Sequence, residues 1–385
     1  MSTMEIERLH TSGVYPKRDL EIVRGSGAHV WDANGREYID CVAGQGVVLV
    51  GHCNPAVVEA IRAQAERLIS CPEVFCNDQR ARALALLVEE APQGLTRVFL
   101  CNSGTEAVEA ALKFARLATG RVGFVAAMRG FHGRTFGALS ATWESKYRDP
   151  FLPLVPGFQH VPFDDLDRMS AAVSSETAAV LLEVVQGEGG VRPSSPGYLA
   201  GVREICDQHG ALLIVDEIQT GCGRTGRMWA CQHDGVLPDL MCVGKGIAGG
   251  VPMGAVLFGS RIPELPQGAH GSTFGGNPLA AAAAVATLRY IREHDLPRRA
   301  AQLGEWLLGC LREIPSRRVR EVRGLGLMVG IELKEKVKPH LLALQEQGVL
   351  ALPATSTVLR LLPPLVIEQA DLERVVHAID ATLSA

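Results

Sequence analysis

The chain has 385 residues, of which 47% are hydrophobic and 21% are charged, and its formal net charge at pH 7 is −4. This composition is typical of a globular protein with a substantial core, arranged as two or three domains or as one large α/β domain with a smaller partner. The small negative charge and the lack of a run of lysines or arginines argue against nucleic-acid binding.

The cysteines and the apolar runs predict a cytoplasmic protein. Ten cysteines are scattered without CxxC pairs at zinc-like spacing, which favours free thiols in a reducing compartment. A metal site at Cys222, Cys231, Cys242 and His233 is the alternative, and we expect no metal. The first residues lack the apolar core of a signal peptide. The longest apolar run, 279–288, is mostly alanine and too short to span a membrane.

The first hundred residues predict a hairpin, two helices and a strand. Short β-like runs at 28–32 and 37–42 are joined by Ala33-Asn34-Gly35, which is a hairpin signal. Helical periodicity covers 55–69, with Asn54 as the N-cap and proline at the first helical position. A second helix is expected over 78–90.

A strand, a small-residue turn and a helix follow one another between residues 97 and 118. The strand covers 97–101, the turn contains Ser103, Gly104 and Thr105, and the helix covers 106–118. This order directs free backbone N–H groups and hydroxyls toward a phosphate. The same pattern also fits a helix N-cap without any ligand.

The next part alternates strands and helices, which predicts a mainly parallel sheet with crossover helices. Strands are expected at 123–127, 178–183 and 211–216, and a helix at 198–209. The loop after the first strand contains Phe131, His132 and Arg134, and the loop after the second is the glycine-rich stretch 184–190, which contains Glu188.

Two strand ends present an acid and a lysine. Asp216 ends the apolar strand 211–216, and Lys245 lies between two glycines after the strand 240–243. Ligands of open α/β sheets bind at such strand ends. The stretch 221–226 matches GxGxxG, but it does not stand directly between a strand and a helix, so we reject a dinucleotide site there.

The C-terminal part predicts a smaller α+β domain. A strand at 254–258 and a loop at 270–278 precede helices at 278–294 and 297–313. Strands at 319–322, 326–333 and 358–361 and helices at 336–346 and 369–383 follow. We expect residues 1–50 to join the small domain, 51–278 to form the large one, and 279–385 to form the C-terminal small domain.

These loops together match the needs of pyridoxal phosphate, which are a phosphate cup, an aromatic ring face, a carboxylate for the pyridine nitrogen and a lysine for the aldehyde. The turn at 103–105 offers the cup, Phe131 or His132 the ring face, Asp216 the carboxylate and Lys245 the amine. The pKa of Lys245 must fall for this task. Each residue alone could also be a helix cap, a core residue or a solvated lysine.

The motifs NSGTEA (102–107), FHGRT (131–135), DEIQTG (216–221), GK (244–245) and STFGGNP (272–278) resemble those of the class III aminotransferases, which have the type I fold of pyridoxal-phosphate enzymes. The resemblance covers essentially the whole chain and implies a homodimer with shared active sites. It implies that the phosphate is held by Ser103, Gly104, Thr105 and, across the dimer interface, Thr273. It also implies that Phe131 stacks on the ring, with His132 beside it. Asp216 would then contact the pyridine nitrogen, Gln219 the ring hydroxyl and Lys245 the aldehyde.

Within the class, the stretches SGVY (12–15), WESKYRDPFLPLV (143–155) and LRLLPPLVI (359–367) resemble acetylornithine aminotransferases, and more closely the enzymes that act on lysine or ornithine linked to an amino-group carrier protein. By this resemblance Arg134 binds the substrate α-carboxylate, and Arg360 binds the carboxylate of glutamate or 2-oxoglutarate. Glu188 is implied to be the movable partner of Arg360. Val184 departs from the proline that is usual there. Alternatives are a 4-aminobutyrate or other ω-amino acid aminotransferase, or a racemase or aminomutase.

Overall fold

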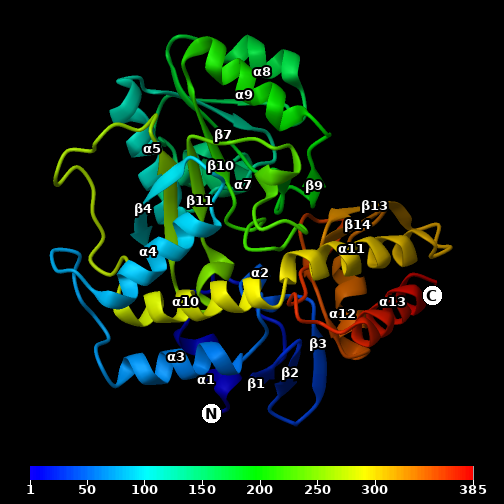
Figure 1. Cartoon of the computed structure of the whole chain (residues 1–385). Coiled ribbons are helices and arrows are strands. Elements are labelled where there is room, and N and C mark those ends of the chain that lie inside the picture. Colours follow the sequence, from blue (N-terminus) through cyan, green and yellow to red (C-terminus); the bar gives the residue numbers. More distant parts are fainter. Residues whose placement is uncertain (385) are drawn as a thin grey trace.

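The computed structural model describes residues 1–384, and its centre is a seven-stranded sheet with the strand order β4-β12-β11-β10-β7-β5-β6 (Figure 1). Strand β12 runs antiparallel to both of its neighbours, and the other strand pairs in the sheet are parallel. The predicted mainly parallel sheet is confirmed. Its strands are β4 (Leu95–Cys101), β5 (Gly123–Ala127), β6 (Phe158–Val161), β7 (Thr177–Leu182), β10 (Leu212–Asp216), β11 (Leu240–Val243) and β12 (Gly254–Gly259).

The sheet is buried on both faces, as the continuous apolar strands predict. Leu213 and Val215 of β10 enter one core cluster, whereas Leu212 and Ile214 enter another on the opposite face. Helix α5 packs on the strands of the second cluster, and α10 packs on α3 and α4. The helices of this part are α3 (Pro55–Ala65), α4 (Asp78–Glu90), α5 (Gly104–Thr119), α6 (Phe136–Ala141), α7 (Ser145–Arg148), α8 (Leu166–Ala172), α9 (Tyr198–His209) and α10 (Pro278–Glu293).

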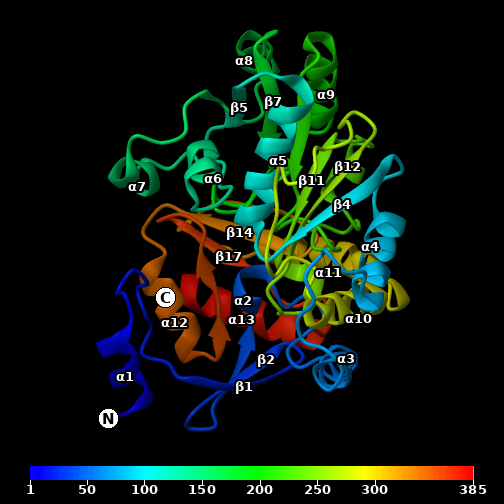
Figure 2. The same cartoon turned by 90° about the vertical axis from the view of Figure 1, so that its left-hand side faces the viewer.

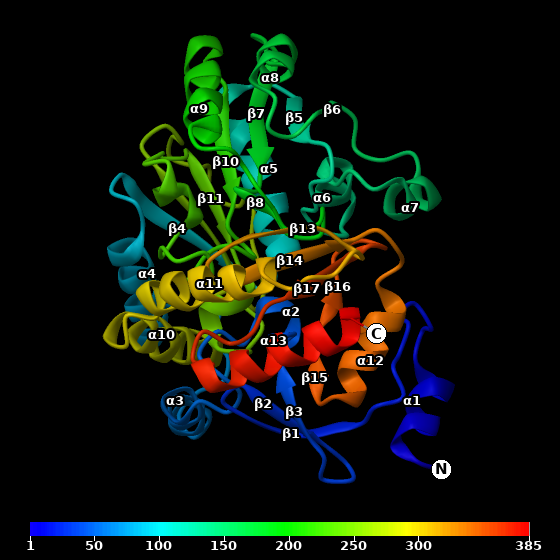
Figure 3. The same ribbon diagram turned by 90° about the vertical axis from the view of Figure 1, so that its right-hand side faces the viewer.

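Two four-stranded sheets form the remainder, and one of them joins the two ends of the chain (Figures 2 and 3). In it, β15 (Val349–Leu350) pairs in parallel with β3 (Glu37–Asp40), next to β2 (His29–Asp32) and β1 (Ile22–Ser26). This pairing supports the predicted association of residues 1–50 with the C-terminal part. The other sheet contains β13 (Val319–Leu325), β14 (Met328–Leu333), β17 (Val358–Leu361) and β16 (Leu352–Pro353), with helices α11 (Leu296–Arg312), α12 (Lys338–Glu346) and α13 (Gln369–Ser384) nearby.

Most predicted elements are found within a few residues of their expected ends, and the differences concern short or exposed elements. Helix α1 (Thr3–His10) was not predicted; none of its residues is buried, and a capping box between Ser2 and Glu5 marks its start. Among the described residues no helix is long and apolar enough to cross a membrane. The other α-helices and strands without a prediction are short: β1, α2 (Ala43–Gly46), α6, α7, β6, α8, β8 (Val185–Gln186), β9 (Arg192–Pro193), β15 and β16.

Two glycines of α11 test how closely this helix packs on the turn between β13 and β14. A Cβ at Gly304 would lie 2.1 Å from the backbone oxygen of Gly326, whereas a Cβ at Gly309 meets nothing within 4 Å. We expect Gly304→Ala to lower the free energy of unfolding by about 2–4 kcal/mol, because backbone must shift. Gly309→Ala should raise it by about 0.5–1 kcal/mol through helix propensity. Urea unfolding measures both, and equal effects would contradict the close packing of α11 on the β13–β14 turn.

Candidate active site

The carboxyl ends of β7, β10 and β11 lie side by side and bring three predicted segments together. β10 pairs in parallel with both other strands, so Asp216, at the end of β10, lies next to the loops that follow β7 and β11. A Cβ at Gly244 would lie 3.3 Å from the Cα of Gly104, which places the start of α5 against the residue before Lys245. The predicted phosphate cup, acid and lysine therefore share one edge of the sheet.

The start of α5 has free donors, as an anion site requires. Ser103 is its N-cap, and its Oγ accepts the Glu106 N–H at 3.3 Å. The N–H groups of Gly104 and Thr105 have no acceptor within residues 1–384. The Thr105 hydroxyl lies 2.8 Å from that of Thr135. Two unpaired N–H groups at the positive end of a helix of four turns fit a phosphate group.

Asp216 and His132 form a buried pair. His132 Nδ1 lies 2.8 Å from Asp216 Oδ2, and the Ile218 N–H donates to Asp216 Oδ1 at 3.0 Å. Burial lowers the pKa of His132, but the hydrogen bond to Asp216 and the charges of Asp216 and Glu183 outweigh burial and raise it. His132 is only 2% exposed, so its ring supports the carboxylate from behind. Of the two residues proposed for the ring face, this arrangement favours Phe131.

Phe131 is half-buried and belongs to an aromatic and cationic group. Its ring lies edge-on to Tyr147 with 6.0 Å between centroids, and the Arg134 guanidinium lies 3.7 Å from the centre of the Tyr147 ring. Arg134 is exposed and has no acidic partner within the described chain. It is therefore free to bind a carboxylate. Tyr147 was not among the predicted site residues.

Lys245 is held in a strained conformation at the start of a short 3₁₀ helix, with φ of +43°. Such a backbone is unfavourable for a residue with a Cβ and is concentrated at functional sites. Burial lowers the pKa of its amine; the Glu188 carboxylate opposes that shift and the Arg360 guanidinium adds to it. The lowered pKa raises the fraction of neutral amine, the form that can attack an aldehyde.

Arg360 projects from β17 toward the loop after β7. Its Nη1 donates to Glu188 Oε1 at 2.5 Å and to Gln219 Oε1 at 3.3 Å. The Arg360 side chain is 2% exposed and that of Glu188 is 27% exposed. The predicted Glu188–Arg360 pair is present, and Gln219 joins it through a contact that the sequence did not indicate.

Thr273 lies in the loop between β12 and α10, next to Ser272. It is exposed, and its side chain makes no hydrogen bond within residues 1–384. The neighbouring Ser272 Oγ accepts from Asn102 Nδ2 at 3.0 Å, which fastens this loop to the turn before α5.

Glu183 is a buried acid that sequence reasoning missed. It follows β7, and its two carboxylate oxygens accept the N–H groups of Phe131 and Gly187, each at 3.1 Å. Burial, together with the charge of Asp216, raises the pKa of Glu183 to about 7, although His132 and the two N–H donors act in the opposite direction. An acid at the end of an apolar strand was the available signal, the same one that identified Asp216.

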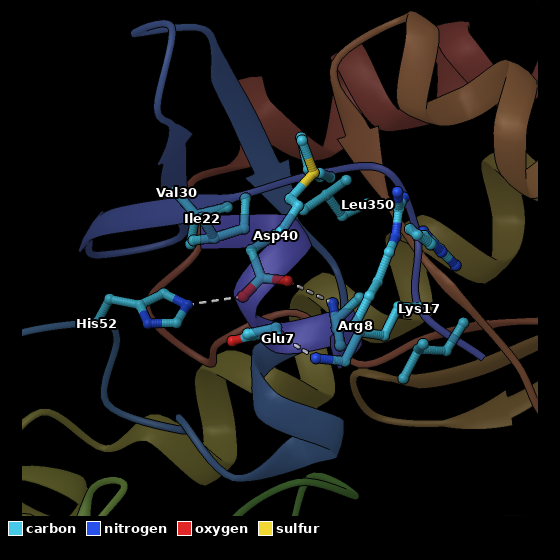
Figure 4. Close-up of a pocket in the computed structure, with 13 residues that line it drawn as sticks. Glu7, Arg8, Lys17, Ile22, Val30, Asp40, His52 and Leu350 are labelled. Atoms are coloured by element: carbon cyan, nitrogen blue, oxygen red, sulfur yellow. Dashed lines mark hydrogen bonds and ion pairs between the residues drawn. The ribbon is translucent and has the colours of Figure 1, made fainter. Parts of the chain in front are cut away.

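The residues present fit pyridoxal phosphate. The start of α5 has two unpaired N–H groups for the phosphate, Asp216 is a buried acid with a histidine behind it, and Lys245 has an amine of lowered pKa. A separate cavity of about 460 Å³ lies between α1 and the N-terminal sheet and contains none of these residues (Figure 4). Residues 1–384 contain no group of three His, Cys, Asp or Glu side chains suited to a metal ion.

Comparison with known proteins agrees with this geometry. Residues 13–383 match the family model described as aminotransferase class III. The LysW-aminoadipate semialdehyde transaminase of Deinococcus radiodurans is 52% identical over 98% of this chain and 89% of its own length. The acetylornithine aminotransferase of Methanopyrus kandleri is 48% identical over 99% of this chain and 98% of its own length. A structure of the ornithine aminotransferase from Toxoplasma gondii, which has pyridoxal phosphate at partial occupancy, matches this chain with a TM-score of 0.95 and 36% sequence identity. The match covers 99% of this chain and 93% of that chain.

Replacing Lys245 tests its role directly. We expect Lys245→Ala to lower kcat by at least about 10³-fold, since both the covalent bond to the aldehyde and the proton carrier are lost. The visible absorbance of the enzyme should shift to that of free aldehyde. The exposed Lys336→Ala is the matched control and should leave both measurements unchanged. An active Lys245→Ala enzyme with an unaltered spectrum would contradict the assignment.

The raised pKa of Glu183 predicts a pH-dependent stability. The folded state holds this proton more tightly than the unfolded state, so stability falls as the pH rises from the ordinary glutamate value to about 7. Glu183→Gln cannot ionise, and its stability should rise relative to the native protein over this range, by at most about 1.4 kcal/mol per pH unit. Urea unfolding at several pH values gives the slopes. Parallel slopes for the two proteins would show that folding does not raise the pKa of Glu183.

Proposed function

This chain belongs to the class III aminotransferases, enzymes that use pyridoxal 5′-phosphate, and we propose that it moves the terminal amino group between an N-blocked lysine or ornithine and the 2-oxoglutarate/glutamate pair. The block is an acetyl group or an amino-group carrier protein. Relatives of 52% and 48% identity, named for a carrier-linked semialdehyde and for acetylornithine, support this substrate class in lysine or arginine biosynthesis.

The observation that carries this proposal is the Glu188–Arg360 pair beside Lys245. One pocket must accept glutamate through its α-amine and a longer substrate through its terminal amine. A paired Arg360 is neutralised by Glu188, whereas an unpaired Arg360 offers two parallel donors to a carboxylate. Glu188 is the more exposed partner, and it lies on a loop, so it is the one that can move.

Bound pyridoxal phosphate supplies an aldehyde that takes up amines and a protonated ring that accepts electrons. Lys245 would hold the cofactor through its Nζ, and its amine would serve as the general base and acid that moves a proton at the reacting carbon of the substrate. The lowered pKa of Lys245 suits both tasks.

Asp216 keeps the ring nitrogen protonated, and His132 holds Asp216 in place from behind. Glu183 links two loops of the site, because its carboxylate accepts the N–H groups of Phe131 and Gly187. Arg134 binds the α-carboxylate of the blocked substrate, at the exposed side of Phe131.

We further propose a homodimer in which Thr273 completes the phosphate site of the partner subunit. Its exposure and the exposed apolar residues Val74, Phe75 and Phe274 support this proposal, because large apolar side chains in water favour association. Sedimentation should give twice the mass of 41.2 kDa; a monomer that retains full activity would disprove it. We place the enzyme in the cytoplasm, which its free cysteines support.

A comparison of amine donors tests the substrate class. Free ornithine, acetylornithine, acetyllysine and carrier-linked lysine are offered with 2-oxoglutarate, and glutamate formation is followed at steady state. We expect a blocked substrate to exceed free ornithine in kcat/KM by about tenfold or more, since the block leaves only the terminal amine to react. Faster reaction with 4-aminobutyrate would favour an ω-amino acid aminotransferase, and turnover without an oxo acid would indicate a racemase or aminomutase.

Replacing Glu188 tests the movable pair. In Glu188→Ala the Arg360 guanidinium has no acid partner, so the ratio of kcat/KM for glutamate to that for the blocked substrate should rise by about tenfold. The exposed Glu204→Ala, on α9, is the matched control. An unchanged ratio in Glu188→Ala would count against the pair as a switch.

A further inference from the structure

The loop that carries Glu188 rests on a row of three residues in the sheet of β13, β14 and β17. Arg323 of β13 pairs with Gly330 of β14, and Gly330 pairs with Arg360 of β17. The three strands lie side by side (Figure 3). Directly paired residues of antiparallel strands face the same side of a sheet. Arg323 and Arg360 therefore project from one face, two strand spacings or about 10 Å apart, with a glycine between them.

The backbone of the loop fills the space above Gly330. A Cβ at Gly330 would lie 2.8 Å from the Cβ of Val191 and 3.3 Å from the carbonyl oxygen of Gly190. The first distance is far shorter than a carbon–carbon contact, so this position has no room for a side chain. The loop therefore lies directly on β14, with Arg323 on one side and Arg360 on the other.

Arg323 holds the backbone at the end of this loop. Its side chain is only 8% exposed. Its Nε donates to the carbonyl oxygens of Gly190 and Val191, each at 3.0 Å, and its Nη2 donates to that of Gly190 at 2.6 Å. Its Nη1 donates to Glu332 at 2.6 Å. Because a guanidinium group is planar and its donors point in fixed directions, these contacts fix where the two carbonyls lie.

Glu332 fixes Arg323 in turn and adds a second link to the loop. Its Oε2 also accepts from Arg192 at 3.0 Å, and Arg192 begins β9 directly after the loop. Burial raises the pKa of Glu332, but its hydrogen bond to Arg323 and the neighbouring guanidinium charges outweigh burial and lower it. The carboxylate is therefore ionised at neutral pH and binds two arginines at the same end of the loop.

The rest of the loop backbone is held as well. The Gly187 N–H donates to Glu183, and the Val191 N–H donates to the Gly187 carbonyl at 3.2 Å. A Cβ at Gly189 would lie 2.7 Å from a backbone oxygen of the loop after β5. With the backbone fixed on both sides of Glu188, its side chain is the part that can turn away from its partner.

We propose that Arg323 is a positioning residue for substrate choice: it fixes the backbone of the loop, keeps the Glu188 carboxylate within reach of Arg360, and so sets how often Arg360 is free. A pair between two fixed groups loses little conformational freedom when it forms, whereas a pair on a loose loop must also order that loop. Loosening the loop therefore weakens the pair. The consequence for substrate choice rests on the proposed function.

Substitution of Arg323 in two backgrounds tests this role. Arg323→Lys keeps a charge beside Glu332 but cannot donate in fixed directions to both carbonyls. We expect the ratio of kcat/KM for glutamate to that for the blocked substrate to rise about threefold or more. The same substitution added to Glu188→Ala should leave the ratio of that variant unchanged, because the side chain through which Arg323 acts is gone. Arg320→Lys is the matched control, since Arg320 also lies on β13 and donates to Glu332.

Two further measurements on the holoenzyme do not depend on the substrate class. Hydrogen exchange of the segment 184–192, followed by mass spectrometry, should be faster in Arg323→Lys than in the native protein and in Arg320→Lys. Glutarate, a dicarboxylate without an amine or an oxo group, should bind about threefold more tightly to Arg323→Lys in calorimetry, because Arg360 is free more often. If Arg323→Lys does not fold, Glu332→Gln removes the charge that holds Arg323 and should change all three measurements in the same direction.

Each outcome decides the proposal. An unchanged ratio in Arg323→Lys, or an equal rise of the ratio in the Glu188→Ala background, overturns it. Exchange or glutarate binding that matches the Arg320→Lys control overturns it too, because the loop would then be held without Arg323. A failed donor comparison, together with faster exchange and tighter glutarate binding, would reject the proposed function and leave the positioning role of Arg323 intact.

Discussion

The buried pair of Asp216 and His132 is the contact on which the rest of the site depends. A carboxylate is costly to remove from water unless it is hydrogen-bonded and paired, and here His132 and the Ile218 N–H provide for both oxygens. This arrangement requires that the loop after β5 fold back over the end of β10. It also brings Glu183 close enough to Asp216 that the two acids repel, which contributes to the raised pKa of Glu183.

The C-terminal part of the chain takes part in the site through Arg360, so its position relative to the central sheet matters. Arg224 helps to set it. This arginine is fully buried, and its Nη1 donates to the carbonyls of Leu327 at 2.8 Å and Pro363 at 2.6 Å, both in the C-terminal part. Burial lowers its pKa to about 9. The stretch 221–226, which matches a dinucleotide pattern, thus contacts the C-terminal part. A Cβ at Gly326 would lie 2.5 Å from the backbone carbonyl carbon of Thr225, so the lack of a side chain at Gly326 allows this contact. No α-helix follows the stretch directly.

Much of the fold and part of the site could be predicted from local patterns. The ends of α4 and α9 and of β5 and β17 agree with the expected ranges, because their apolar periodicity and their caps are local. Helix α1 was missed although its Ser2–Glu5 capping box is a local signal, because the segment is short and buries none of its residues. Glu183, like Asp216, follows an apolar strand, but that pattern alone does not show which acids lie in a site. Glu183 and Tyr147 are placed there by contacts with Phe131 and Gly187 on other loops.

By itself the sequence determined the alternating α/β class, the acid and lysine after two strands, and the small-residue turn before α5, since each depends on neighbouring residues. Tertiary structure alone decided which side chains meet. It placed His132 behind Asp216 and Gln219 against Arg360. The physical reason is that pKa shifts, ion pairs and cavities depend on distances and burial, and those follow from strand order and packing across the chain.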